Sequence, residues 1–233
     1  MPKKIQKLPL NLEARFAELC RSIGHKNPKP VFEVIRKFHT RPGRYHHNLD
    51  LIRRGLEEFS AARHLAEDPE AVEIALFFKD LIFEHYLHDS KPRSARIALH
   101  HLVGYGVKRN TAYYIFNLVL LADPGYRYSN DPSRSPQTID QMIVADIDAS
   151  VLGLPPKEYK EYERNIRREY LAEVHKELSE DEYAIHRTIF LQRFLGEHPI
   201  YLTEFFRKKY EKQAKENIAG RLAELKEQLN GED

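Results

Sequence analysis

Three short stretches, far apart in the sequence, carry imidazole, carboxylate and ammonium groups that are suited to chemistry. They are Arg44-Tyr45-His46-His47-Asn48-Leu49-Asp50-Leu51, Phe77-Phe78-Lys79-Asp80 and Asp146-Ile147-Asp148. Imidazoles and carboxylates together are common ligands of the divalent metal ions used in hydrolysis. The same groups also serve as general acids and bases. These stretches therefore predict either a metal-dependent hydrolytic centre or an ion pair that has replaced one.

The second stretch is unusual because its charged pair lies inside an apolar run from Ala75 to Phe83. A helix that is apolar on nearly every side is usually buried. Burying Lys79 beside Asp80 is costly unless both charges find partners. We therefore expect a buried charged cluster here. The alternative is an ion pair on a helix surface, which would contribute only ~0–1 kcal/mol.

Composition limits the class of protein. The 233 residues carry 37 basic and 35 acidic side chains, a net charge of +2, which does not suit a dedicated nucleic-acid binder. The single cysteine, Cys20, excludes an internal disulfide and a cysteine-based zinc finger. No run approaches the ~18 apolar residues that span a bilayer, and the basic N-terminus leads into no apolar signal core. We expect a cytoplasmic protein that is not inserted in a membrane.

The spacing of apolar residues predicts an all-α chain, because it recurs every three or four positions and no useful length alternates as in a strand. Breakers such as Gly24, Arg41-Pro42-Gly43 and Gly153-Leu154-Pro155-Pro156 separate the expected helices. Helices are expected over residues 10–23, 31–40, 69–83, about 93–103, 110–122, 137–152 and about 203–229. A further helix begins at Arg44, and apolar residues from Tyr159 to Tyr170 and from Tyr183 to Phe194 mark two more. We expect one domain over 1–233, with its core at about 10–222 and flexible ends at 1–8 and 230–233. The loop at 123–136 is long enough to be a lid or a binding loop.

The three stretches together resemble the HD superfamily of metal-dependent phosphohydrolases, and specifically the bacterial predicted metal-dependent HD phosphohydrolase family. The likeness runs from about residue 10 to 222. It includes Arg93-Ser94-Ala95, Ile166-Arg167-Arg168-Glu169-Tyr170, Phe194-Leu195 and Ile200-Tyr201. It implies an HD-type bundle of roughly ten helices, a divalent metal held by two histidines and two aspartates, and a phosphorylated substrate.

This chain departs from the family pattern at the metal ligands. The family reads Tyr-His-Asn-x-x-His and then His-Asp. His47-Asn48 matches the His-Asn pair, and His46 stands where the family has Tyr. The first metal-binding His falls on Leu51, and the His of His-Asp falls on Lys79. Asp80 is kept, and the later metal-binding Asp is expected at Asp146. An Asn-Glu pair of the family is replaced by Ser90-Lys91.

The replacements predict a degenerate metal site. Leu51 binds no metal, and the Lys79 ammonium repels one while neutralising Asp80 and Asp146. Asp148 is expected to be a structural hydrogen-bond acceptor. We therefore expect a catalytically inactive protein, or pseudoenzyme, that needs no cofactor and binds a phosphate-containing small molecule or nucleotide. The side chains expected to bind that ligand are those of Arg44, His47, Asn48, Lys79 and Arg93.

Two alternatives stay open at this stage. In the first, the chain is an active phosphohydrolase in which His47 and Asp80 are catalytic. Asp80 and Asp146, with His46 or His47, would then hold Mn, Mg, Fe, Ni or Zn. In the second, Glu84-His85-x-x-His88-Asp89 supplies a different metal site. A homodimer is compatible with either.

Overall fold

The helices begin where the sequence supplies caps. Five of them start at a side chain that accepts a hydrogen bond from a backbone N–H of the first turn, which satisfies a donor that the helix itself leaves unpaired. The capping residues are Asn11, Asn48, Asp68, Thr138 and Ser179. Thr138 and Ser179 form complete capping boxes with Gln141 and Glu182.

The computed structural model describes residues 11–84, 89–122, 135–173, 179–196 and 198–230. Ten α-helices and no strand lie in these ranges, which confirms the all-α prediction. The helices are α1 (Leu12–Ser22), α2 (Pro28–His39), α3 (Leu49–Ala62), α4 (Pro69–Phe78), α5 (Ser90–Gly104), α6 (Arg109–Leu120), α7 (Ile139–Ala149), α8 (Pro156–Glu173), α9 (Glu180–Gln192) and α10 (Glu204–Asn230). Two 3₁₀ turns are η1 (Arg63–Leu65) and η4 (Ser150–Gly153).

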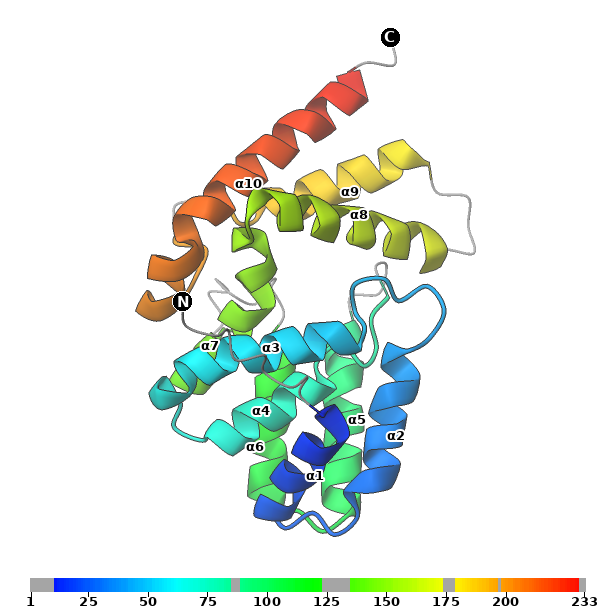
Figure 1. Cartoon of the computed structure of the whole chain (residues 1–233), viewed down its shortest axis with the longest axis vertical. Helices are drawn as coiled ribbons and strands as arrows, with labels where there is room; N and C mark the ends of the chain where they lie inside the picture. The colour runs from blue at the N-terminus through cyan, green and yellow to red at the C-terminus, as the bar shows by residue number, and fades with distance from the viewer. Residues whose placement is uncertain (1–10, 85–88, 123–134, 174–178, 197, 231–233) are drawn as a thin grey trace, which may run out of the picture.

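The helices form two groups that α7 joins. Helices α1 to α6 pack together in one group, and α8, α9 and α10 lie together at the other end of the molecule (Figure 1). Helix α7 and η4 run between them, with α7 against α3, α4 and α6 and η4 against α8 and α10. One continuous cluster of buried apolar side chains, from Leu12 to Leu225, extends through both groups. The chain is therefore a single all-α domain.

Helix α4 is the most deeply buried of these elements. Asp68 caps it, Pro69 occupies its first turn, and every residue from Ala71 to Phe78 is buried. The helix ends at Phe78, earlier than the expected residue 83, because Lys79 turns to an extended conformation and Asp80 has a φ of +66°. Lys79 and Asp80 thus lie at the C-terminal end of a buried helix rather than inside it.

The predicted starts of the second and third helices are wrong. The third helix begins at Leu49 rather than at residue 44, because Asn48 caps it through Asp50 N–H. The second helix, which we expected from residue 31, begins at Pro28 as α2. A proline is tolerated at the first helical position because its missing N–H would be unpaired there anyway. Because α3 begins only at Leu49, His47 lies in the loop before that helix.

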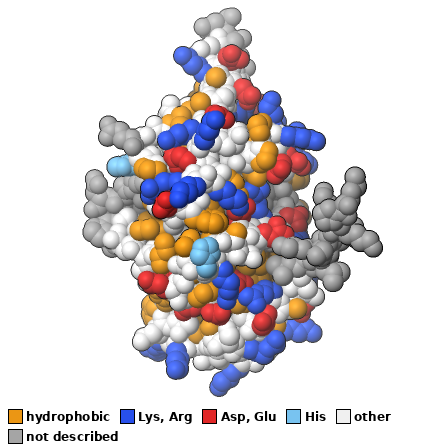
Figure 2. All heavy atoms as spheres, turned by 60° about the vertical axis from the view of Figure 1, so that its left-hand side comes forward, with side chains coloured by type: hydrophobic (Ala, Val, Ile, Leu, Met, Phe, Trp, Pro, Cys, Tyr) orange, Lys and Arg blue, Asp and Glu red, His pale blue; other side chains and the backbone are white. Residues whose placement is uncertain are grey.

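The surface carries both signs of charge side by side. In Figure 2, Lys and Arg side chains alternate with Asp and Glu over the face that is shown, without an extended basic area. Many of these charges form helix-surface pairs, such as Lys208 with Glu204 at 2.5 Å. None of the described helices is both long enough and apolar enough to cross a bilayer.

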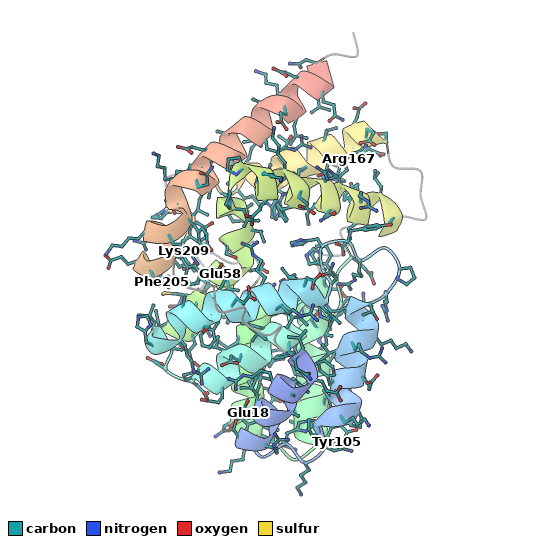
Figure 3. All side chains as sticks on the ribbon, in the orientation of Figure 1. Glu18, Glu58, Tyr105, Arg167, Phe205 and Lys209 are labelled. Atoms are coloured by element: carbon teal, nitrogen blue, oxygen red, sulfur yellow. The ribbon has the colours of Figure 1, made fainter. Side chains whose placement is uncertain are left out.

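A polar contact fastens the last helix to the first group of helices. Lys209 of α10 and Glu58 of α3 lie next to each other (Figure 3), with 2.6 Å between Nζ and Oε2. The hydroxyl of Tyr210 donates to the other oxygen of Glu58 at 2.6 Å. Asp140 of α7 makes a comparable link, since it accepts from the backbone N–H groups of Glu67 and Asp68 and from the Tyr114 hydroxyl.

Two glycines provide a matched test of this packing. A Cβ added at Gly153 would lie 2.6 Å from Cβ of Tyr210, whereas one added at Gly220 of α10 meets nothing within 4 Å. We expect Gly153→Ala to lower the free energy of unfolding by about 1–3 kcal/mol, the usual cost of overpacking. Gly220→Ala should raise it by about 0.5–1 kcal/mol, because alanine favours a helix. Urea denaturation of both variants measures the two signs; equal effects would contradict the close approach of Tyr210 to η4.

Several expectations fall on residues that the structure does not describe. They are the flexible ends expected at 1–8 and 230–233, of which only Asn230 is described, and the proposed lid at 123–136, of which only 135 and 136 are described. The histidines of the alternative metal site, His85 and His88, also lie outside the described residues.

Candidate functional site

Four charges meet at the end of helix α4, three of them buried and the fourth, on Asp148, partly exposed. The Lys79 ammonium donates to Asp80 at 2.5 Å and also to Asp148, which α7 contributes. The Lys91 ammonium, from the first turn of α5, donates to the other oxygen of Asp80 at 2.6 Å and lies 3.8 Å from Asp148. Lys79 and Asp80 are 3% and 1% exposed. The buried charged cluster expected from the apolar run is thus confirmed, and we call these four residues the lysine–aspartate cluster.

The cluster is balanced, with two ammonium groups and two carboxylates. Burial alone raises the pKa of the Asp80 carboxyl, but the nearby Lys79 and Lys91 outweigh burial and hold that pKa well below its usual range. The pKa of Asp148 is lowered for the same reason, against burial and the repulsion from Asp80. Both carboxylates are therefore ionised at neutral pH. Each carboxylate lies within 4 Å of both ammonium groups.

The backbone around Asp80 is held by an arginine. Arg44 donates to the carbonyl oxygens of Asp80 and Leu81, each at 2.9 Å, and to that of His47 at 3.2 Å. These bonds secure the turn in which Asp80 adopts its left-handed conformation, which costs a non-glycine residue free energy. Arg44 therefore positions the cluster through backbone atoms.

The loop before α3 brings two histidines beside the cluster. Glu169 of α8 is 1% exposed, and its Oε2 accepts from the backbone N–H groups of His46 and His47 at 2.8 and 3.0 Å. The His47 ring stacks on Phe83 with ring centres 3.4 Å apart, and its Nδ1 lies 3.2 Å from Oε1 of Glu169. The His46 ring packs edge-on against Tyr162 at 4.8 Å. One buried carboxylate thus fixes the position of both rings.

Both histidines are neutral at pH 7. Burial is the largest influence and lowers the pKa of each ring well below its ordinary value. Each ring therefore has one N–H group that can donate a hydrogen bond and one unprotonated nitrogen that can accept one. For His47, the attraction of Asp80 acts in the opposite direction but does not overcome burial.

A pocket of about 290 Å³ opens above the cluster, between the two groups of helices. Its floor consists of Asp80, Lys91 and Asp148, and His46 and His47 form part of one wall. Helices α8 and α9 supply most of the remaining wall, which is largely aromatic. The lining residues that belong to it are Tyr162, Ile166, Tyr170, Tyr183, His186, Arg187 and Phe190, joined by Phe83, Val151, Leu152 and Phe194.

The opposite end of the pocket contains a second compensated charge. Arg187 is 6% exposed and pairs with Glu163, with Nε and Oε2 3.2 Å apart. Its Nη2 donates to the Tyr162 hydroxyl at 3.0 Å. Arg221 of α10 also reaches Glu163, at 3.3 Å. The guanidinium of Arg187 is therefore bound within the protein through Nε and Nη2.

The structure distributes the expected ligand-binding residues unevenly. His47 lines the pocket, whereas Lys79 lies beneath its floor as part of the cluster. Arg44 and Asn48 line a separate shallow depression, and Asn48 caps α3. Arg93 is partly exposed and faces Glu84 at 3.4 Å and Asp89 at 3.9 Å. That these five residues bind a ligand remains a prediction. Of the five, only His47 lines this pocket.

One predicted pairing is wrong. Lys79 bonds to Asp148, which we expected to be only structural, and not to Asp146. The carboxylate of Asp146 instead accepts from the backbone N–H groups of Leu202 and Thr203, each at 2.8 Å, and from the Thr203 hydroxyl at 2.8 Å. Asp146 thus stabilises the chain where it enters α10.

Lys91 is the residue of the cluster that sequence reasoning overlooked. It was noted only as a replacement for a glutamate of the HD pattern. That replacement changes an acid to a base in the first turn of α5, where a positive charge is unfavourable, and this is the signal that could have revealed it. In the structure Lys91 supplies the second ammonium and forms part of the pocket floor.

These residues do not fit a divalent metal ion. Both carboxylates of the cluster already bond to ammonium groups, and the carboxylate of Asp146 is used elsewhere. Across the described residues, no group of three or more His, Cys, Asp or Glu side chains is arranged to hold a metal. The rearranged metal site with His46 or His47, Asp80 and Asp146 has no support in this geometry.

Comparison of the chain with protein-family models, with curated proteins and with solved structures finds no match. The likeness to the HD superfamily therefore depends on the residues that carry it.

Proposed function

We propose that this chain is a non-catalytic protein that binds a small molecule in the pocket above the lysine–aspartate cluster. In this proposal the protein is related to HD phosphohydrolases, and the Lys79 ammonium replaces the divalent metal that Asp80 would otherwise hold. One observation carries the proposal. The two carboxylate oxygens of Asp80 accept hydrogen bonds from two different ammonium groups, those of Lys79 and Lys91.

The chemistry supports this interpretation. A bound metal promotes hydrolysis because it polarises a phosphoryl oxygen and lowers the pKa of a bound water. An ammonium group can neutralise the same carboxylates, but it has no open coordination position at which water is activated. The cluster therefore supplies structural stability at the floor of the pocket without an activated nucleophile.

The pocket itself supports a binding role. It is concave, and its lining combines apolar and aromatic side chains with about as many polar ones, which can orient a ligand. Its walls come from both groups of helices, and its polar side chains are held in place by internal bonds such as those of Glu169. Such preorganisation reduces the entropy lost when a ligand binds.

Metal analysis and a phosphatase assay test the proposal. We expect the purified full chain to hold substoichiometric Mn, Fe, Ni, Zn and Mg, and to leave 2-naphthyl phosphate intact when these ions are added. Stoichiometric metal together with metal-dependent release of 2-naphthol would overturn the non-catalytic function.

A double variant tests the origin of the cluster. Lys79→His with Lys91→Glu removes both ammonium groups and adds an imidazole and a carboxylate beside Asp80 and Asp148. We expect this variant to bind Mn²⁺ or Ni²⁺ in titration calorimetry, where the parent chain does not. Lys208→Glu on the exposed surface of α10 is the matched control and should bind neither. A folded double variant without metal affinity would contradict the replacement of a metal by Lys79.

A further inference from the structure

The pocket differs from a phosphate site in its charges. Apart from the exposed Arg193, the charges that the structure describes at the pocket are compensated: Lys79 and Lys91 face Asp80 and Asp148, Arg187 faces Glu163, and Glu84 faces Arg93. A phosphate dianion on the floor would meet the two carboxylates at the same range as the ammonium groups. Since burying an uncompensated charge is costly, the interior disfavours a phosphate. Arg193 also lines the pocket, but it is exposed to solvent, which weakens its attraction for an anion.

The walls favour a flat ring system. Three tyrosines and one phenylalanine of α8 and α9 line the pocket, together with Phe194 just after α9 and with Phe83, which lies beside His47. Aromatic side chains contact rings by offset stacking or edge-to-face packing, which adds to the gain from burying apolar surface. The aliphatic members of the lining, such as Ile166, extend the same apolar surface.

The size of the pocket limits the ligand. An apolar cavity of ~150 Å³ holds one benzene molecule. The present volume of about 290 Å³ is close to twice that value. It therefore suits two fused rings with a small substituent better than a single ring or a nucleotide with its sugar and phosphates.

The imidazole of His46, on the wall of the pocket, can form further hydrogen bonds. His46 lines the pocket, and its ring makes aromatic contacts with His47 and Tyr162. Among the residues that the structure describes, neither of its ring nitrogens takes part in a hydrogen bond. Its backbone N–H donates to Glu169, and its carbonyl oxygen accepts from Asn48 N–H. A neutral imidazole in this position offers one donor and one acceptor to an occupant.

On the basis of the proposed function, we infer that the pocket takes a neutral, planar aromatic molecule of about two fused rings, held at one polar substituent by the imidazole of His46. The rings lie among the aromatic side chains of α8 and α9. The substituent, a hydroxyl or an amide-like edge, faces His46.

Three probes test this ligand class on the full chain. They are 2-naphthol, 2-naphthyl phosphate and inorganic phosphate, with binding followed by naphthyl fluorescence and by titration calorimetry. We expect 2-naphthol to bind at least about tenfold more tightly than its phosphate ester, a difference of about 1.4 kcal/mol. Inorganic phosphate should not compete. Equal or tighter binding of the ester, or no binding of 2-naphthol, would overturn the inference.

These outcomes are separate from the failure of the proposed function. Tighter binding of 2-naphthyl phosphate without its hydrolysis would reject the neutral ligand and leave a non-catalytic binding protein. Metal-dependent hydrolysis of the ester would reject the non-catalytic function itself.

Variants locate the binding site. His46→Phe keeps a ring against Tyr162 but removes the hydrogen bond, so it should weaken 2-naphthol binding about three- to tenfold, as expected for one hydrogen bond, and leave naphthalene binding unchanged. Ile166→Trp, which fills the pocket, should abolish binding of both probes. Ile189→Trp on the exposed face of α9 is its control and should have no effect. Equal losses of 2-naphthol and naphthalene in His46→Phe would exclude a hydrogen bond from His46.

Discussion

Lys79→Met is expected to lower the free energy of unfolding by about 3–5 kcal/mol, the usual cost of removing one partner from a buried ion pair. The change preserves most of the side-chain volume but leaves Asp80 and Asp148 with a single ammonium, that of Lys91. The cluster then has one uncompensated negative charge in a site where the Lys79 side chain is only 3% exposed. Urea denaturation followed by far-UV circular dichroism measures the loss.

Two further variants show whether charge is the cause. Lys208→Met removes an ammonium whose side chain is 76% exposed, so it should change the free energy of unfolding by less than about 1 kcal/mol. Adding Asp148→Asn to Lys79→Met restores a balance of one ammonium and one carboxylate. This double variant should recover much of the lost stability, since coupled buried charges are not additive. If it is no more stable than Lys79→Met, lost packing rather than charge imbalance explains the effect.

Acidification from pH 7 to pH 5 is expected to destabilise the protein by about 2 kcal/mol or more, largely through its buried histidines. His39 is 1% exposed, and burial lowers its pKa to about 4. In the unfolded chain the pKa is near 6.5, so at pH 5 the unfolded state binds a proton that the folded state does not. This difference alone amounts to about 2 kcal/mol at pH 5. His47 adds to the loss, because its pKa is also lowered in the folded protein.

The neighbours of His39 have opposing effects. Arg44 and Lys79 lower its pKa further, whereas Asp80 and the bond to the His47 carbonyl raise it. Since a carbonyl oxygen only accepts, its 3.1 Å contact with Nδ1 places the ring proton on that nitrogen. His39→Gln retains a donor but cannot be protonated in this range. Its free energy of unfolding should fall less steeply between pH 7 and pH 5 than that of the parent. Parallel profiles for the two proteins would show that His39 does not drive the pH dependence.

The fold was largely predictable because its signals are local. Asp68-Pro69 at the start of α4 combines a capping side chain with a first-turn proline, and both act as the sequence indicates. The apolar run that follows predicted a buried helix, and the charges at its end therefore had to find partners. Lys79 and Asp80 could be identified as a buried cluster from that conflict alone.

The identity of the partners was not predictable in the same way. Asp146 and Asp148 are two residues apart on α7, and at 3.6 residues per turn they point to nearly opposite sides of the helix. The sequence does not say which side faces α4. The packing of α7 between the two groups of helices decides it, and it places Asp148 at the cluster and Asp146 at the start of α10.

The loop from Arg44 to Asn48 was misjudged for a related reason. Its residues are compatible with a helix, and the decisive interactions come from far along the sequence. Glu169 binds the N–H groups of His46 and His47, while Arg44 donates to carbonyl groups near Asp80. These long-range bonds satisfy polar backbone groups that a helix would otherwise have satisfied.

The position of the pocket gives an occupant a mechanical role. A bound molecule would touch Asp80 and Lys91 at the end of the first group of helices, and Tyr162 and Phe190 in the second. Its binding free energy would then help to hold together the two groups of helices, which the chain connects through α7. A ligand present at a hundredfold excess over its Kd adds about 2.7 kcal/mol to the free energy of unfolding. The protein saturated with ligand would consequently be cleaved more slowly by proteases, and its backbone amides between the two groups of helices would exchange more slowly. This holds even if the ligand never undergoes a reaction.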